Sequence, residues 1–129
     1  LEAASGTYVG FVDADDFVDR GFFEELLRAA LVTRMPVVQG GFDLAEERDG
    51  HVDFRDSYEA AIAAGWQRRL MGPMSCSWLS ARDIMASQPT IWRRIYDRRF
   101  LAAKRLRFPQ HIRAFDDLFF NFMSLAHAL

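Results

Sequence analysis

An α/β fold with a mainly parallel sheet flanked by helices is predicted by three features of the sequence. The short apolar run Thr7–Val12 is rich in β-forming residues and is followed directly by acidic residues. Apolar residues then recur at helical spacing across Gly21–Thr33. A second apolar run, Pro36–Leu44, follows this helix, so strand, helix and strand alternate as they do in parallel sheets.

The composition is typical of one globular domain. The chain has 129 residues, of which 50% are hydrophobic, and this length allows one modest domain with a single core. The net charge of −2 creates no field that would attract nucleic acid. Cys76 is the only cysteine, which excludes an intrachain disulfide and fits a reducing, cytoplasmic setting. No apolar run in this chain approaches the ~20 residues of a membrane span. The expected location is the cytoplasm, and peripheral attachment of the full-length protein to the membrane is compatible with it.

The first half of the chain is expected to add a hairpin to the two strands and the helix. Asp19 can cap the helix that begins near Gly21. Glu46–Gly50 has the composition of a turn, and His51–Phe54 can return as the hairpin partner of the second strand.

The second half of the chain gives weaker local signals. A helix is expected over Tyr58–Ala64, whereas Gly65–Met85 shows no clear period. Thr90–Leu101 is compatible with either a helix or a strand, and Leu106–Pro109 is expected to be short and extended. Apolar residues at helical spacing predict a last helix over Phe115–Leu129.

The stretch Asp13-Ala14-Asp15-Asp16 is the sharpest chemical feature of the sequence. It places its carboxylates directly after an apolar strand, and ligands of open α/β folds gather beyond the carboxyl ends of strands. Crowded carboxylates repel one another unless a cation or a proton intervenes. Mg²⁺ and Mn²⁺ prefer oxygen ligands, commonly one or two carboxylates plus substrate phosphates. The pattern therefore suits a metal ion that holds a diphosphate, although an acidic turn that caps the following helix would have the same sequence.

Asp116-Asp117 is a second acidic pair, at the start of the predicted last helix. Acids at this place favour the helix dipole, which is a purely structural explanation. The functional explanation is a general base, because a carboxylate beside a second carboxylate and an apolar wall is suited to accept a proton. Phe115, Phe119 and Phe120 could supply that wall.

A basic and aromatic cluster precedes this pair. It comprises Trp92, Arg93, Arg94, Tyr96, Arg98 and Arg99. Such a cluster can contact sugar rings or phosphates, but the favoured interpretation is an amphipathic element with a buried Trp and solvated Arg heads. His51, His111 and His127 do not share a metal-ligand spacing, so no zinc site is predicted.

Taken together, these motifs resemble those of family 2 glycosyltransferases, which have the GT-A fold. Ala3–Asp16 resembles the family's strand that leads into a D-x-D-D motif, and Gly21–Leu27 resembles the helix after it. Trp92–Pro109 resembles the segment before the family's second acidic motif, and Phe115–Phe120 resembles that motif itself. The matches are collinear, and the two acidic motifs stand about 100 residues apart.

The resemblance implies a role for each acidic residue. Asp13 and Asp15 match the pair that serves a divalent cation, Mn²⁺ or Mg²⁺, and the diphosphate of the sugar nucleotide. Asp16 matches an additional acid that holds the loop or touches the donor sugar. Asp117 matches the base that deprotonates the acceptor hydroxyl, and Asp116 matches the acid before it, which is commonly Glu.

The implied reaction is an inverting, metal-dependent transfer of a sugar from a nucleotide-diphospho-sugar donor. The implied acceptor is a saccharide or glycolipid hydroxyl, in glycan or polysaccharide synthesis. Two alternatives remain from the residues themselves. One is a metal-dependent phosphotransfer enzyme, because acids after a strand also suit Mg²⁺–phosphate chemistry. The other is a non-catalytic interaction module with a glycosyltransferase-like fold.

The N-terminal nucleotide-binding half of that family has no counterpart in the sequence. Leu1–Ser5 reads like the end of a helix closed by Gly6. We therefore expect residues 1–129 to form a single partial GT-A catalytic domain. On this interpretation the isolated chain is inactive, and the unpaired edge of its first strand favours self-association.

Overall fold

The computed structural model of the chain describes residues 1–56, 90–112 and 115–128. Contacts divide the chain into a larger unit, Leu1–Gly40 with Ser75–Leu129, and a smaller unit, Gly41–Met74. The predicted helix over Tyr58–Ala64, the segment between it and Met85, and Cys76 lie outside the described residues.

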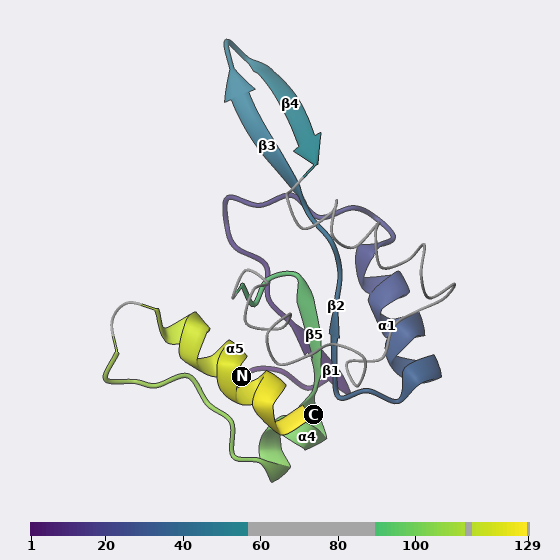
Figure 1. Cartoon of the computed structure of the whole chain (residues 1–129), viewed down its shortest axis with the longest axis vertical. Coiled ribbons are helices and arrows are strands. Elements are labelled where there is room, and N and C mark those ends of the chain that lie inside the picture. The colour runs from purple at the N-terminus through teal and green to yellow at the C-terminus, as the bar shows by residue number, and fades with distance from the viewer. Residues whose placement is uncertain (57–89, 113–114, 129) are drawn as a thin grey trace. The chain divides into compact units, whose positions relative to one another are not determined.

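A three-stranded sheet forms the centre of the larger unit (Figure 1). Its strand order is β1 (Tyr8–Gly10), β5 (Arg94–Asp97), β2 (Val37–Gln39). Both neighbouring pairs are antiparallel, and Val9 and Val37 each lie opposite Tyr96. The prediction of a mainly parallel sheet is therefore wrong for the described strands. β1 and β2 do run in the same direction, but β5 returns between them and pairs with both.

Helix α1 (Phe22–Thr33) covers one face of this sheet. Its buried residues Leu26 and Ala30 pack against Ile95 of β5. The spacing of four residues places Leu26 and Ala30 on one side of the helix. The predicted helix is therefore confirmed, and the same apolar spacing explains which side it buries.

The start of α1 differs from the prediction in its cap. Gly21 is the N-cap and provides no side-chain hydrogen bond. The Asp19 backbone carbonyl accepts a hydrogen bond from the Phe22 N–H at 3.1 Å. The predicted capping by the Asp19 side chain is thus wrong, because a backbone turn already serves the first helical N–H.

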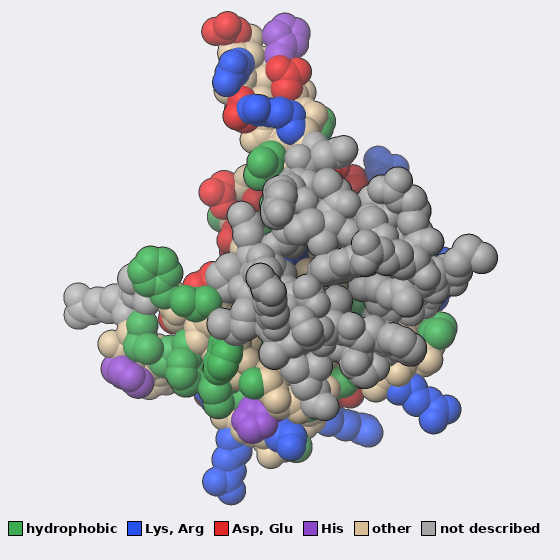
Figure 2. Space-filling view, viewed as in Figure 1, with side chains coloured by type: hydrophobic (Ala, Val, Ile, Leu, Met, Phe, Trp, Pro, Cys, Tyr) green, Lys and Arg blue, Asp and Glu red, His purple; other side chains and the backbone are tan. Residues whose placement is uncertain are grey.

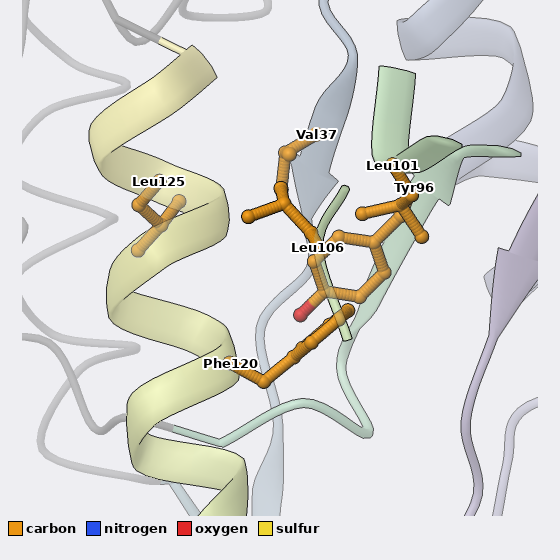
Figure 3. Packing of buried hydrophobic residues seen from close by; sticks show 6 residues of the cluster. All are labelled: Val37, Tyr96, Leu101, Leu106, Phe120 and Leu125. Atoms are coloured by element: carbon orange, nitrogen blue, oxygen red, sulfur yellow. The ribbon is translucent and has the colours of Figure 1, made fainter. Parts of the chain in front are cut away.

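Helix α5 (Asp116–Ala128) covers the opposite face of the sheet. The buried hydrophobic residues on this side are Val37, Tyr96, Leu101, Leu106, Phe120 and Leu125 (Figure 3). Successive residues of a strand point to opposite faces. For this reason Ile95 packs toward α1 while Tyr96 packs toward α5, and Figure 1 shows the two helices on either side of the sheet. The predicted last helix is confirmed.

The segment Thr90–Leu101, for which the sequence left helix and strand open, contains both. Strand β5 is followed directly by helix α4 (Arg98–Ala103). The Asp97 carboxylate accepts hydrogen bonds from the backbone N–H groups of Arg99 (2.7 Å) and Phe100 (3.2 Å). This is a helix N-cap, and it sets the residue at which the strand gives way to the helix.

The described part of the smaller unit contains a hairpin of β3 (Asp43–Arg48) and β4 (His51–Asp56). Asp49 and Gly50 connect the strands with φ angles of 51° and 78°, and two-residue hairpin turns favour such left-handed values. The predicted hairpin is confirmed with a shorter turn. The single strand predicted over Pro36–Leu44 is wrong, because β2 and β3 divide this stretch between two sheets.

The first residues of the chain form a turn where the sequence suggested the end of a helix. The Ala4 N–H donates a hydrogen bond to the Leu1 carbonyl at 3.2 Å. Among the described residues, no helix has the length and apolar character needed to cross a membrane.

Candidate functional site

The acidic loop begins where β1 ends. After Gly10 the chain passes Phe11 and enters the loop Asp13–Asp16, in which every acidic side chain is exposed. The Asp16 N–H donates a hydrogen bond to the Asp13 carbonyl at 3.2 Å, which closes the loop. The loop therefore follows the carboxyl end of its strand as predicted, although β5, not β1, is the central strand of the three described.

The carboxylates of this loop act on one another. Partial desolvation raises the pKa of the Asp16 carboxyl from its ordinary value of 3.8, and the charges of Asp13 and Asp15 raise it further. The turn thus holds like charges close together. A cation bound in the loop would relieve this repulsion.

Asp116 and Asp117 open helix α5, and both are half-buried. The Asp117 carboxylate accepts a hydrogen bond from the Leu118 N–H at 2.8 Å. At about 100° per residue, Asp117 lies on the same side of the helix as the buried Asn121 and Ser124. This side of α5 faces the sheet, so the candidate base lies on the core side of the helix.

An aromatic contact joins Phe11, directly after β1, to the helix that carries the candidate base. Phe11 meets Phe120 edge to face with ring centroids 6.0 Å apart, and Tyr96 contacts them at 5.9 and 5.4 Å. Phe11 is two residues before Asp13, and Phe120 is three residues after Asp117. The Cα atom of Asp13 therefore lies within about 7 Å of the Cα atom of Phe11, and the Cα atom of Asp117 lies within about 7 Å of that of Phe120. This contact links the two segments of the chain that carry the acidic motifs.

Of the three Phe residues predicted to wall Asp117, Phe120 is buried and the other two are exposed. Phe120 is 1% exposed and packs on the sheet side of α5. Phe115 and Phe119 are 76% and 46% exposed. Phe119 follows Asp117 by two positions, which places it about 160° away around the helix. Helical geometry therefore turns Phe119 away from Asp117, whereas Phe115 precedes the helix with a left-handed φ of 61°.

Three buried residues with polar side chains lie at the interface of β5 and α5, and we call them the buried polar group. They are Tyr96 of β5 and Asn121 and Ser124 of α5. The Ser124 hydroxyl donates a hydrogen bond to the Asn121 carbonyl at 2.9 Å, and Tyr96 is completely buried. Burial raises the pKa of the Tyr96 hydroxyl to about 12, with a further contribution from Asp117, while Arg94 and Ser124 oppose the shift. Tyr96 therefore keeps its proton near neutral pH and remains a hydrogen-bond donor.

Sequence reasoning missed this buried group, although one signal for it exists. Asp117, Asn121 and Ser124 are spaced by four and three residues on a helix whose other residues are mostly apolar. That spacing places them on one side of the helix. A row of polar residues on a side that also carries the buried Phe120 indicates a polar site at the interface.

Arg93 and Arg94 are buried, contrary to expectation. Their side chains are 1% and 0% exposed, whereas Trp92 is only half-buried. The interpretation of a buried Trp with solvated Arg heads is thus wrong for these two arginines. Arg94 is the first residue of the central strand and Arg93 directly precedes it, and helices cover this strand on both faces. Both charges act on the Tyr96 hydroxyl, so they lie near the buried polar group.

The acidic loop fits a divalent cation that is held jointly with a substrate. Within the part of the chain that the structure describes, no three His, Cys, Asp or Glu side chains form a group able to hold an ion alone. Asp13 and Asp15 nevertheless offer carboxylate oxygens, which Mg²⁺ and Mn²⁺ prefer. Mg²⁺ commonly takes one or two protein carboxylates and completes its shell with substrate phosphates and water. The repulsion felt by Asp16 is consistent with such a site.

Comparisons with known proteins cover nearly the whole chain. Residues 1–100 match the family described as Glycosyl transferase family 2; this range includes the acidic loop and ends before α5. An uncharacterized glycosyltransferase of Bacillus subtilis (strain 168), EpsJ, is 29% identical over 128 residues, which is 99% of this chain. The chain spans 35% of the length of that relative. No solved structure matches the chain.

Proposed function

Because the chain belongs to glycosyl transferase family 2, we propose that it forms part of an enzyme that transfers a sugar from a nucleotide-diphospho-sugar to an acceptor hydroxyl. The proposed transfer is inverting and depends on a divalent cation, in glycan or polysaccharide synthesis. The contact between Phe11 and Phe120 supports this most directly, because it links the segment before the acidic loop to the helix that begins with Asp116 and Asp117. Membership of the family favours sugar transfer over phosphotransfer.

The acidic loop is the proposed donor site. Asp13 and Asp15 would hold a divalent cation, Mn²⁺ or Mg²⁺, together with the diphosphate of the donor. When bound, the cation would stabilise the negative charge that develops on the leaving diphosphate. Asp16 would hold the loop or touch the donor sugar. Its raised pKa supports a place within a crowded anionic loop that a cation can neutralise.

Asp117 is the proposed general base. Its carboxylate would accept the proton of the acceptor hydroxyl while that oxygen attacks the anomeric carbon. The bond between the anomeric carbon and the diphosphate oxygen breaks in the same displacement, so the configuration inverts and no covalent intermediate forms. The packing of Phe120 and Asn121 against the sheet fixes the helix turn that carries this base. Asp116 would be the supporting acid beside it.

Two measurements on the full-length protein test the proposal. Calorimetric titration with nucleotide-diphospho-sugars should show binding that requires Mn²⁺ or Mg²⁺. NMR of the product should show an anomeric configuration opposite to that of the donor. Hydrolysis of a simple phosphate ester without sugar transfer would instead support a phosphotransfer enzyme. A protein that binds neither the nucleotide-diphospho-sugar nor the cation would instead be a non-catalytic module.

A further inference from the structure

The side of α5 opposite Asp117 is apolar and exposed. Leu118, Phe119 and Phe122 are 43%, 46% and 48% exposed, and Phe115, directly before the helix, is 76% exposed. At about 100° per residue, the three helical residues fall within a sector of about 100°. These four residues are called the apolar stripe below, and Figure 2 shows hydrophobic side chains gathered over α5. Contiguous exposed apolar side chains of this kind mark interaction surfaces.

A basic segment precedes the apolar stripe in the chain. Residues 98–112 contain no Asp or Glu. The Lys and Arg side chains of this basic segment are all exposed: Arg98, Arg99, Lys104, Arg105 and Arg107. The chain as a whole has a net charge of −2, so this positive charge is a local concentration and not a property of the composition.

The basic segment packs along α5, which joins the two features into one region. Leu106 belongs to the same buried cluster as Leu125. Phe108 stacks on Phe120 with ring centroids 4.3 Å apart and planes 14° from parallel. Arg107 stands between Leu106, which is buried, and Phe108, which is half-buried, and is itself exposed. Its charge is therefore held beside the helix that carries the apolar stripe.

We propose that the apolar stripe and the basic segment form one surface that docks on an anionic lipid bilayer. A bilayer interface supplies both matching chemistries, anionic headgroups for Lys and Arg and the acyl boundary for Phe and Leu. A soluble polyanion would match the charges alone. A second copy of the chain would match the stripe alone, and its own basic segment would repel this one.

The proposed orientation leaves the candidate active site accessible. Asp117 lies on the sheet side of α5, and the apolar stripe lies on the other side. The inference does not depend on the proposed sugar transfer, because it rests on exposure and charge outside the acidic motifs.

Vesicle co-sedimentation with the full chain tests this docking. The chain should bind vesicles that contain phosphatidylglycerol at least tenfold more tightly than vesicles of phosphatidylcholine alone. Replacing Lys104 and Arg107 by Gln should weaken binding about 25-fold, at roughly fivefold for each charge near the surface. Replacing Phe119 and Phe122 by Ser should weaken it at least tenfold.

Matched controls separate docking from general effects. Leu31→Ser with Val32→Ser removes two residues of α1 that are 66% and 70% exposed and should leave vesicle binding unchanged. Arg48→Gln with Arg55→Gln removes the same charge from the hairpin and should also leave it unchanged. Circular dichroism checks that each variant is folded.

Three results would overturn the proposal. The first is equal or absent binding to the two kinds of vesicle. The second is binding to soluble polyphosphate that matches vesicle binding and does not change in the Phe119 and Phe122 variant, which would indicate a soluble polyanion. The third is a smaller oligomer in light scattering for the Phe119 and Phe122 variant, with its vesicle binding unchanged. This result would mean that the apolar stripe binds a second copy of the chain.

Discussion

Asp117 occupies a different environment from the acids of the loop. It is half-buried, accepts a hydrogen bond from the Leu118 N–H, and lies near a Tyr96 hydroxyl that keeps its proton. Asp13 and Asp15 are exposed in a short loop. A base needs a fixed position, whereas a cation that carries a diphosphate needs an open approach. The two environments therefore suit two different tasks.

Asp117→Asn should lower kcat by about 10²–10⁴-fold, the usual contribution of a general base. The amide is nearly isosteric and can still accept the Leu118 hydrogen bond, but it cannot take the acceptor proton. Donor affinity, measured by calorimetry, should stay within a factor of about two of the unmodified protein. Loss of donor affinity with normal turnover would move Asp117 to the donor site.

Asp15→Ala should abolish the binding of nucleotide-diphospho-sugar that depends on Mn²⁺, while the fold stays intact because the side chain is exposed. Calorimetry in the presence and absence of Mn²⁺ measures the effect. Asp19→Ala is the matched control, since Asp19 is exposed near the same loop. Near-normal turnover of the Asp15 variant would show that the assignment of the metal site is wrong.

Asp16→Asn should stabilise the protein at neutral pH. The raised pKa means that the folded state holds this proton more tightly than the unfolded chain does. Ionisation of Asp16 therefore opposes folding, and this loss of stability develops as pH rises from 3.8 through the higher folded value. The gain in Tm should be present at pH 7 and vanish below pH 3.8. An equal gain for Asp19→Asn would mean that general charge reduction is the cause.

Elements whose signals are local could be predicted from the sequence, and those that depend on distant pairing could not. The apolar spacing of α1 and α5 and the Asp49-Gly50 turn identify two helices and a hairpin. The antiparallel β5 was not foreseen, because its partners stand far away in the chain and its buried Arg94 breaks the expected apolar pattern.

The candidate site divides in the same way. The two acidic motifs are local patterns, and the sequence correctly places one after a strand and the other at a helix start. The packing that links their segments depends on the contact between Phe11 and Phe120, which no local pattern indicates. The buried Tyr96 hydroxyl likewise follows from the packing of β5 against α5.

The junction of β5 and α4 depends on a single cap. Asp97→Ala removes the acceptor for the Arg99 and Phe100 N–H groups and should cost about 1 kcal/mol of unfolding free energy. Asp97→Asn should cost much less, because Asn caps helices about as well as Asp. Urea unfolding followed by circular dichroism measures both. Equal losses for the two variants would show that the charge, and not the cap, matters.

The larger unit as a whole depends on how α5 packs against the sheet. Phe120 contacts Phe11, Tyr96 and Phe108, which come from three separate segments of the chain. Phe120 therefore links the helix of the candidate base to the residue directly after β1, to the central strand and to the basic segment. Phe122, two residues later, is 48% exposed on the other side of the same helix.

Phe120→Ala and Phe122→Ala make the same chemical change at a buried and at an exposed position of α5. Phe120→Ala should lower the unfolding free energy by about 3–5 kcal/mol, because it leaves a cavity in the core. Phe122→Ala should change it by no more than about 0.5 kcal/mol, as exposed substitutions usually do. Urea unfolding of the full chain measures both values. A Phe120 variant that folds under native conditions should also lose turnover, because the helix turn that carries Asp117 would lose its packing against the sheet. Similar losses of stability for the two variants would mean that α5 does not bury the side that carries Phe120 and Asp117, and the site built on that packing would fail with it.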